Sequence, residues 1–558
     1  CEASGRALAK ERESPSLSKM HAVDHVLVVS YILLIVGIGV WFARHRGEQS
    51  SAQDYFLASK RTHWFVVGCS FFASNIGSDS IIGLSGAGAG FGLAASIFDW
   101  GSAWFFVLLG WIFIPFYHKT RIFTLPQYLE LRFDGRLRAY LSALSLLGMV
   151  LVAYALTIYS AVIVLRTVLD WAMWPSIVAI VVVTAFYTFS GGLKAVVYTE
   201  VLQTVLLLIG TTITCATALS SVGGISGLQE RLADKRMFHL LRTDPDTPYP
   251  VAGIFLGAPW LIGWYHCCNQ DMVQRGLSAR DEDHAKAGCV MAGWLKLLPP
   301  LLFCLPGMAA HALYPAELGC ADEPLEGGGV RSTCEHPDYA FPVLVNQHLP
   351  AGARGLVLAA VLAAMMSTLA SAFNSSATLF TMDLYARARP QASPGEYVRV
   401  GRLATMGLAV VSMLWVPMIE RLGESVYVYT QMANAVLAPP VFALFLLSLL
   451  VPSLNAAGGL LGMGLGHFVG LLRLTMCVLR GGCAVAAMSP NPLVRAFLGS
   501  NFLHFAAFEG FVSAALMVVV SRCTGGLSLS HLERVRGLTW KTRHVTRPVG
   551  MSELVDAV

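Results

Sequence analysis

Long apolar runs dominate the 558-residue sequence and set the strongest limit on its fold. A helix needs about 20 consecutive apolar residues to cross the hydrocarbon core of a bilayer. A membrane β-barrel would instead show segments of about ten residues with alternating polarity. The sequence therefore predicts an all-α integral membrane protein. Thirteen spans are expected near residues 24–43, 63–88, 96–117, 140–165, 172–190, 197–222, 250–268, 286–315, 354–384, 402–420, 425–450, 456–479 and 502–521.

Composition agrees with this interpretation and narrows the class of protein. Hydrophobic residues make up 55% of the chain and charged residues 13%, against about 45–50% and about 25% in ordinary soluble domains. The sequence contains no Walker phosphate-binding loop, so it gives no support to pumping driven by ATP. It also lacks the nucleophile–base and metal-ligand spacings of an enzyme. The expected partners are a lipid bilayer and small solutes, without nucleic acid, and the sequence carries no information on an accessory membrane subunit.

The placement of Lys and Arg predicts the orientation, because these residues favour cytoplasmic loops. When the thirteen spans simply alternate, the basic loops after the first, third, seventh and ninth spans share one side with the basic tail. We therefore expect a multi-pass protein of the plasma membrane with its N-terminus outside and its C-terminus inside. The expected parts are an extracellular segment at 1–23, a transport domain at 24–521 and a cytoplasmic tail at 522–558.

Two cysteines differ from the others, most of which fall within spans and are expected to pack there as small apolar residues. Cys320 and Cys334 lie in the polar 316–340 loop, which the predicted topology places outside. Disulfides form and persist in such an oxidising compartment. We therefore expect a disulfide between them.

Two of the apolar runs are interrupted by polar residues. Residues 73–80 read ASNIGSDS, and residues 264–270 read WYHCCNQ. Secondary transporters commonly place their binding site at helix breaks in matching positions of two inverted repeats. A packed Ser/Asn interface between helices would explain either patch alone. The two patches lie five spans apart, the interval expected for two five-helix repeats, and this favours a transport site.

Ionisable residues inside a membrane are costly and tend to be functional. Asp79, Asp99, Glu200 and Lys296 lie within apolar runs. A carboxylate and an ammonium could bind ligand hydroxyl groups, although a purely structural ion pair would give the same pattern, and Glu200 could be solvated at the end of its helix. The hydroxyl cluster at 367–376 offers neutral oxygens suited to sodium, but such hydroxyls also bond back to their own helix.

Four blocks of sequence follow one another in the chain: FASNIGS at 72–78, GGLKAVVYTEVLQT at 191–204, QRGLSA at 274–279 and NSSATLFTMDLY at 374–385. In this order they resemble the sodium/glucose cotransporter family, a branch of the solute:sodium symporters. The resemblance runs from about residue 24 to residue 520. It implies a leucine-transporter-like core of two inverted five-helix repeats with additional peripheral helices.

The resemblance also implies which residues bind the ion and the solute. The sodium ion would be held by backbone carbonyls and side-chain hydroxyls at five matching positions, and the sugar by polar side chains, with one aromatic ring acting as an inner gate. The predicted sodium ligands are Ala73, Ile76 and Ala364 through carbonyls, and Ser367 and Thr368 through hydroxyls. The predicted substrate residues are Asn75, Asp79, Ser80, Asp99, Ser102, Tyr265, Lys296 and Gln431.

The sequence departs from the family pattern around the expected sugar. Ser80 and His266 stand where many animal sugar carriers have His and Trp. Asp99 replaces Glu, and Asp79 stands where vertebrate members have Gly. These differences leave the sugar's identity open. Ala370 occupies a position that is Thr in carriers coupling two sodium ions, which favours one sodium per sugar.

Together these features predict a sodium-coupled symporter that imports a monosaccharide such as glucose or galactose by alternating access. The alternative solutes are myo-inositol or, less favoured, a monocarboxylate, choline or proline. A second alternative is a sugar-gated sensor that depolarises the membrane without moving sugar. The substitutions at Ser80 and His266 keep it open, as does Ile262, which stands where the family usually has a polar residue facing the sugar. The chain is not expected to be an enzyme.

Overall fold

The computed structural model describes residues 20–44, 52–244, 247–325, 329–419, 426–479, 490–525, 535 and 537–544. Residues 1–19 of the predicted N-terminal segment and most of the predicted tail lie outside the described residues.

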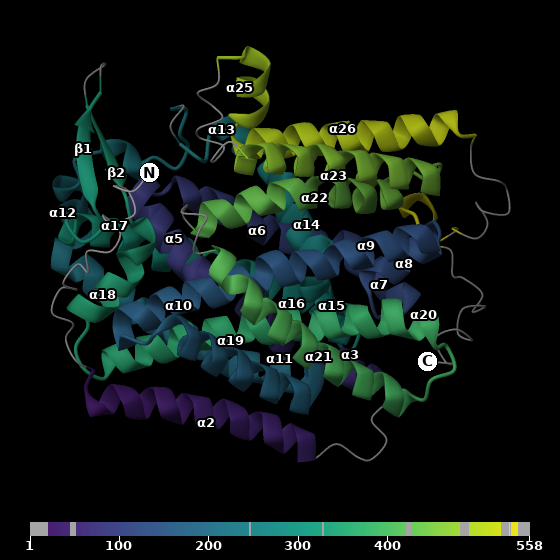
Figure 1. Ribbon diagram of the computed structural model, residues 1–558, viewed down its shortest axis with the longest axis horizontal. Helices are drawn as coiled ribbons and strands as arrows, with labels where there is room; N and C mark the ends of the chain where they lie inside the picture. Colours follow the sequence, from purple (N-terminus) through teal and green to yellow (C-terminus); the bar gives the residue numbers. More distant parts are fainter. Residues whose placement is uncertain are drawn as a thin grey trace.

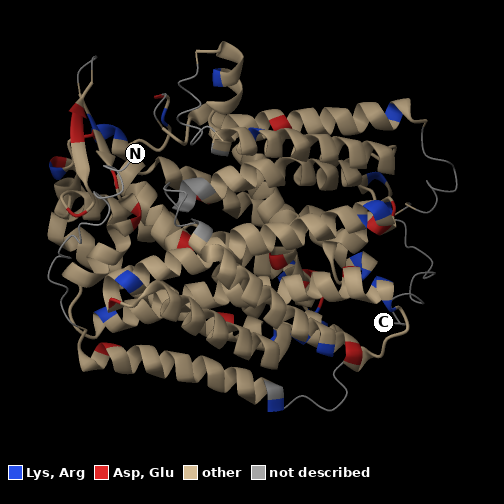
Figure 2. Ribbon diagram, viewed as in Figure 1, with Lys and Arg blue, Asp and Glu red and all other residues tan. Residues whose placement is uncertain are grey.

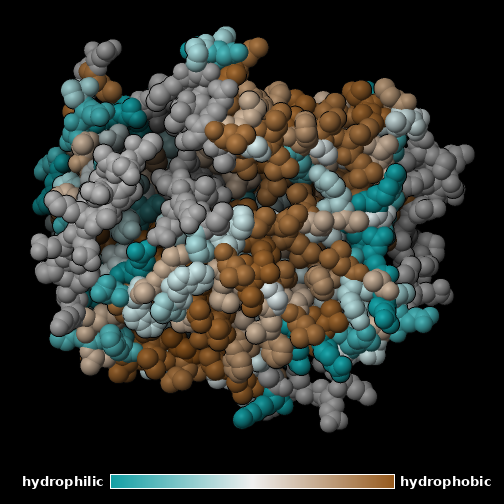
Figure 3. Space-filling view, in the orientation of Figure 1, coloured by the Kyte–Doolittle hydropathy of each residue, from teal (hydrophilic) through white to brown (hydrophobic). Residues whose placement is uncertain are grey.

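Long helices lie side by side and form one bundle (Figure 1). Charged residues gather mainly toward the two ends of these helices (Figure 2), and hydrophobic side chains cover the middle of the face shown in Figure 3. The helices in the first half of the chain are α2 (Ala22–Arg44), α3 (Ala52–Leu57), α4 (Trp64–Asn75), α5 (Ser78–Phe91), α6 (Ala94–Leu108), α7 (Ile114–Thr120), α8 (Leu125–Arg132), α9 (Gly135–Gly148), α10 (Ala155–Leu169), α11 (Met173–Val222), α12 (Gly224–Arg231), α13 (Val251–Leu256), α14 (Ala258–Cys267) and α15 (Gln270–Ser278). They are followed by α16 (Glu282–Leu295), α17 (Leu305–Leu313), α18 (Ala340–His348), α19 (Ala353–Leu379), α20 (Ala386–Ala388), α21 (Pro394–Ile419), α22 (Val426–Leu450), α23 (Ala456–Leu479), α25 (Pro492–Leu498) and α26 (Phe502–Cys523).

The helices differ in how deeply they lie in the bundle. In α19, 89% of the membrane-crossing window is buried inside the protein, against 17% in α2. Helix α19, which carries the hydroxyl cluster at 367–376, is therefore the central helix of the bundle. Helix α2 presents most of its surface outward, as an apolar helix in contact with lipid can.

The number of spans differs from the prediction. By length and composition, the described helices supply ten candidate spans, or up to twelve when each of two bent helix pairs counts as one. The predicted count of thirteen is therefore not confirmed. The difference arises at α11, which counts as one span although it contains both expected spans near 172–190 and 197–222, one on each side of a backbone break.

The backbone of α11 breaks at Gly192, where φ is 58° and ψ is −165°. Glycine adopts a positive φ without the steric cost that a side chain brings. Before the break, Tyr187 packs closely against Gly39 of α2. After it, the Gln203 amide donates a hydrogen bond to the Tyr31 hydroxyl at 3.2 Å, so the chain has moved back toward the N-terminus of α2.

Both interruptions predicted from the sequence are breaks in the structure. Helix α4 ends at Asn75 and α5 begins at Ser78, with a bend of 58° between them. The stretch formed by α13 and α14 ends at Cys267 and α15 begins at Gln270, with a bend of 45°. The Asn269 side chain caps α15 by accepting a hydrogen bond from the backbone N–H of Asp271, the second residue of that helix. This bond satisfies a donor that the break would leave free.

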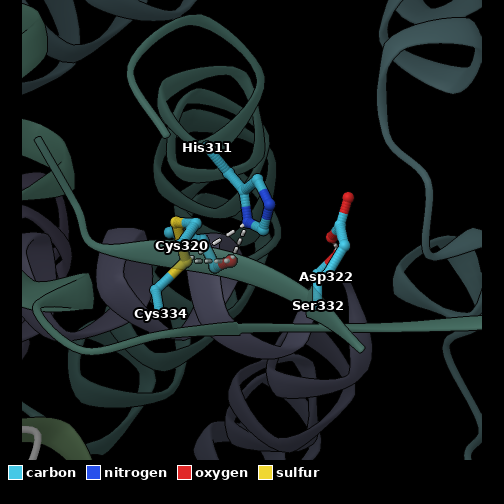
Figure 4. The surroundings of a disulfide bond; sticks show 6 residues. His311, Cys320, Asp322, Ser332 and Cys334 are labelled. Carbon is cyan, nitrogen blue, oxygen red and sulfur yellow. Dashed lines mark hydrogen bonds between the residues drawn. A yellow bond between two sulfur atoms is a disulfide. The ribbon is translucent and has the colours of Figure 1, made fainter. Parts of the chain in front are cut away.

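Strands β1 (Cys320–Pro324) and β2 (Val330–Cys334) form an antiparallel hairpin at one end of the bundle. The predicted disulfide joins Cys320 to Cys334 at the base of this hairpin (Figure 4). His311 of α17 points toward the disulfide and lies 2.7 Å from the Ala89 carbonyl oxygen. Because the two sulfurs are bonded to each other, this group of three residues is not a metal site.

Reduction of this disulfide is expected to loosen the hairpin without unfolding the bundle. The bond closes a separation of 14 residues, and a loop of about 15 residues is stabilised by about 3 kcal/mol in the chain-entropy model. Limited proteolysis of Cys334→Ser should therefore cut the hairpin about tenfold faster or more, since cleavage follows the population of the open form. Cys523→Ser, which changes an exposed free cysteine, should leave the cleavage rate unchanged. Equal cleavage of the two variants would contradict the prediction.

Candidate substrate and ion site

A cavity of about 650 Å³, open space included, lies beside the α4/α5 break. Helices α6, α14, α19 and α22 contribute the remaining walls, together with Lys296, the residue that follows α16. The structure brings all eight predicted substrate residues to this one cavity, although they come from distant parts of the sequence. They are Asn75, Asp79, Ser80, Asp99, Ser102, Tyr265, Lys296 and Gln431.

An ion pair forms one wall of the cavity. The Lys296 ammonium donates a hydrogen bond to Asp99 Oδ1 at 2.8 Å, and the two side chains are 3% and 10% exposed. Asp99 Oδ2 is buried and has no hydrogen-bond partner among the described residues. Lysine carries three N–H donors, so both members of the pair can bond a hydroxyl group of a ligand while keeping each other neutralised.

His266 lies against Asn75 and lines the cavity. Its Nδ1 is 2.9 Å from the Ile262 carbonyl oxygen, which only accepts hydrogen bonds, so Nδ1 carries the proton. Nε2 is then free to accept from the Asn75 amide at 3.3 Å. The imidazole packs edge-on against Phe106 and Tyr265, with ring centroids 4.6 and 5.3 Å away.

Several lining residues were not assigned to the site from the sequence, and two of them carry polar side chains that face a predicted substrate residue or share its helix face. His266 was recognised only as a departure from the family pattern, and Asn434 was missed. Asn434 lies three residues after Gln431 on α22, and residues three apart share one face of a helix. That spacing is the signal that could have found it.

The α4/α5 break frees backbone carbonyls, and hydroxyl groups meet them. The Ser367 hydroxyl of α19 lies 2.8 Å from the Ala73 carbonyl oxygen and 2.7 Å from that of Ala364. The Thr368 hydroxyl lies 3.4 Å from the Ser74 carbonyl oxygen. Ile76 lies at the break itself, where α4 ends. The predicted sodium ligands therefore meet between α4 and α19, and their neutral oxygens are of the kind that a hard cation prefers.

Glu200 does not lie in solvent at a helix end, the alternative that the sequence left open. Glu200 and Arg275 are both completely buried, and their nearest charged atoms are 3.1 Å apart. The hydroxyl groups of Ser70 and Ser371 also donate to the Glu200 carboxylate. This buried network ties α11, α15, α4 and α19 together close to the helix breaks.

Comparison with known proteins decides the family. The model of the sodium:solute symporter family matches residues 55–466, well over half of the chain. The protein belongs to the sodium:solute symporter family. The expectation that the chain is not an enzyme is thereby confirmed, because members of this family are transporters.

Several relatives of this symporter are sodium/glucose cotransporters, which confirms the resemblance inferred from the sequence. Sodium/glucose cotransporter 2 of Rattus norvegicus is 37% identical over 93% of this chain and 81% of its own length. Sodium/glucose cotransporter 4 of Homo sapiens is 37% identical over 94% of this chain and 79% of its own. Sodium/myo-inositol cotransporter 2 of Bos taurus is 34% identical, over 96% and 81%.

The fold of the symporter is shared with a solved structure. A sodium-coupled sialic acid symporter in its substrate-bound outward-open state superposes with a TM-score of 0.74 at 21% identity, covering 92% of this chain and all of its own. This likeness confirms the predicted leucine-transporter-like fold.

Proposed function

We propose that this protein is a sodium-coupled symporter that imports a monosaccharide, one sodium ion per sugar, by alternating access. The observation that carries the proposal is the cavity in which all eight predicted substrate residues meet, directly beside the hydroxyl-lined break of α4. The names of the sodium/glucose cotransporter relatives support the solute class.

The chemistry of the cavity suits a neutral polyol. A sugar offers many hydroxyl groups, each of which both donates and accepts hydrogen bonds. Asp99 accepts, Lys296 donates, and the amides of Asn75 and Gln431 do both, while Tyr265 offers an aromatic face. Hydrogen bonds to charged groups are the stronger ones, so the Asp99–Lys296 pair is the proposed anchor of the sugar.

Sodium is the proposed driving ion. Bound between α4 and α19, it would replace the Ser367 and Thr368 contacts to carbonyls with its own and fix the broken helix in the form that completes the sugar site. Coupling requires that each ligand favour the same state as the other. One charge crossing about 60 mV contributes roughly 1.4 kcal/mol, and a tenfold sodium gradient contributes about the same. One ion can therefore support roughly hundredfold accumulation.

The proposed setting is the plasma membrane, with the N-terminus outside and the C-terminus inside. The disulfide hairpin supports this orientation, because it lies at the end of the bundle where α2 begins and disulfides belong to an oxidising compartment.

Uptake of labelled glucose and galactose into liposomes tests the proposal, with sodium or choline outside. Wild-type protein is expected to accumulate sugar only with sodium. Thr368→Ala should raise the sodium concentration for half-maximal uptake by about tenfold or more, since it removes a ligand whose loss leaves neighbouring oxygens poorly satisfied. Thr217→Ala is the matched control, because that hydroxyl bonds only within its own helix.

The same assay separates the alternatives. Sodium-dependent uptake of myo-inositol in place of glucose would favour the solute named in one relative. A sugar-evoked current without accumulation would favour a sensor. Uptake that is indifferent to sodium would refute the proposal.

A further inference from the structure

His266 and Asn75 join the two broken helices at the wall of the substrate cavity. His266 is the second-last residue of α14, directly before the second break. Its Nε2 lies 3.3 Å from the side-chain nitrogen of Asn75, the last residue of α4 before the first break. The two residues are 2% and 7% exposed, and both line the cavity. The contact is therefore enclosed by protein and close to where a ligand would bind.

Three contacts besides Asn75 hold the imidazole in one orientation. Nδ1 lies 2.9 Å from the Ile262 carbonyl oxygen, and the rings of Phe106 and Tyr265 meet the imidazole at interplanar angles of 79° and 72°. Such edge-to-face arrangements are favoured between aromatic rings. A half-turn of the imidazole would place carbon atoms at both hydrogen-bonding positions, so the bonds to Ile262 and Asn75 would both be lost.

The orientation of the imidazole dictates that of the Asn75 amide. Because Nδ1 carries the proton, Nε2 can only accept a hydrogen bond, whereas an amide donates at its nitrogen and accepts at its oxygen. The amide nitrogen of Asn75 must therefore face His266, since the opposite arrangement would bring two acceptors together. One N–H of Asn75 is used inside the protein, and the carbonyl oxygen and the second N–H keep fixed places.

We propose that His266 is a positioning residue, which fixes the donor and acceptor pattern that Asn75 presents to the sugar and thereby sets which hydroxyl arrangement the cavity accepts. The inference rests on the proposed function for the class of ligand. A site that holds its polar groups ready for a hydroxyl rejects an analogue lacking that hydroxyl, because the buried groups are then left unpaired. His266 needs no contact with the sugar, because it acts through Asn75.

Uptake of labelled D-glucose and of its monodeoxy analogues tests the inference. His266→Phe keeps a ring but removes the acceptor, so KM for D-glucose should rise about tenfold while the maximal rate changes by less than about twofold. In the wild type, the analogue that lacks the hydroxyl bound by Asn75 should have a KM at least about tenfold above that of D-glucose. His266→Phe should narrow this ratio to about threefold or less, because the amide is no longer held in one orientation.

Two variants separate positioning from packing. His266→Gln offers an amide oxygen that can accept from Asn75, so it should keep KM and selectivity within about threefold of the wild type. His467→Phe is the matched control. His467 is 2% exposed, and its nitrogens lie 2.8 Å from the Tyr140 hydroxyl and 3.1 Å from the Leu437 carbonyl oxygen, but it is not part of the substrate cavity. The same loss of a buried imidazole there should leave KM and selectivity unchanged.

A double-mutant cycle with Asn75→Ala identifies the residue through which His266 acts. Asn75→Ala combined with His266→Phe should raise KM no further than Asn75→Ala alone, because two residues that act as one unit are not additive. Additive effects of the two substitutions would overturn the inference. So would a His266→Phe variant whose KM rises equally for D-glucose and for every deoxy analogue, since that result means a structural role only.

Nitrogen-15 NMR of the full-length protein with labelled histidine tests the geometry without any sugar. The His266 signals, identified by their absence in His266→Gln, should show the proton on Nδ1, and Asn75→Ala should shift the Nε2 signal. A proton on Nε2, or an Nε2 signal indifferent to Asn75→Ala, would overturn the inference even if His266→Phe does not fold. The proposed function fails separately, through absence of sodium-dependent sugar uptake in the wild type.

Discussion

Replacing Lys296 by alanine is expected to abolish sodium-dependent sugar uptake. The substitution removes a donor from the proposed sugar site and leaves the Asp99 carboxylate buried with no cation, since Lys296 is its one ion-pair partner among the described residues. Breaking a buried ion pair by removing one partner costs about 3–5 kcal/mol. If that cost falls on the sugar-binding state, uptake falls by more than about a hundredfold. Initial rates of labelled sugar uptake, normalised to protein at the membrane, measure the effect.

Helix α16 offers a matched control in Lys286→Ala. Lys286 lies ten residues before Lys296 and pairs with Glu282 at 2.5 Å, but the two side chains are 25% and 40% exposed. Exposed pairs contribute about 0–1 kcal/mol, so this variant should transport at nearly the wild-type rate. Near-normal uptake by Lys296→Ala, with sodium dependence intact, would remove the ion pair from the proposed site.

The membrane fold could be predicted because each span carries its own signal. An apolar run must form a helix in lipid to satisfy its backbone, and a polar patch inside such a run marks a break. The breaks at 76–77 and 268–269 were found in this way. The predicted count of thirteen is not confirmed, because α11 counts as one span although its backbone breaks at Gly192 between two expected spans.

The site was harder to predict than the fold. Polar residues within spans pointed to Asp99 and Lys296, and family resemblance supplied the sodium ligands. Asn434 escaped notice because its place in the cavity depends on which helices face one another.

The Glu200–Arg275 pair is expected to carry much of the stability of the central bundle. Arg275→Ala would leave Glu200 charged, completely buried and without its cation, at a cost of about 3–5 kcal/mol. The variant should lose most of its thermal stability in detergent, seen as early loss of the monodisperse peak on heating. Arg136→Ala breaks a pair whose side chains are 70% and 31% exposed and should shift stability by no more than about 1 kcal/mol.

A double variant distinguishes two causes of instability: loss of the attraction between Glu200 and Arg275, and burial of the Glu200 charge without a partner. Replacing a buried ion pair by apolar residues of similar volume is often neutral or stabilising. Arg275→Met with Glu200→Leu should therefore recover much of the stability that Arg275→Ala loses, even though it removes both members of the pair. Transport need not recover with it, because Ser371 hydrogen-bonds Glu200 and belongs to the same helix as Ser367 and Thr368. If the double variant is as unstable as Arg275→Ala, the stability resides in the hydrogen-bond network that joins the four helices. A buried charge without a partner is then not the cause of the instability.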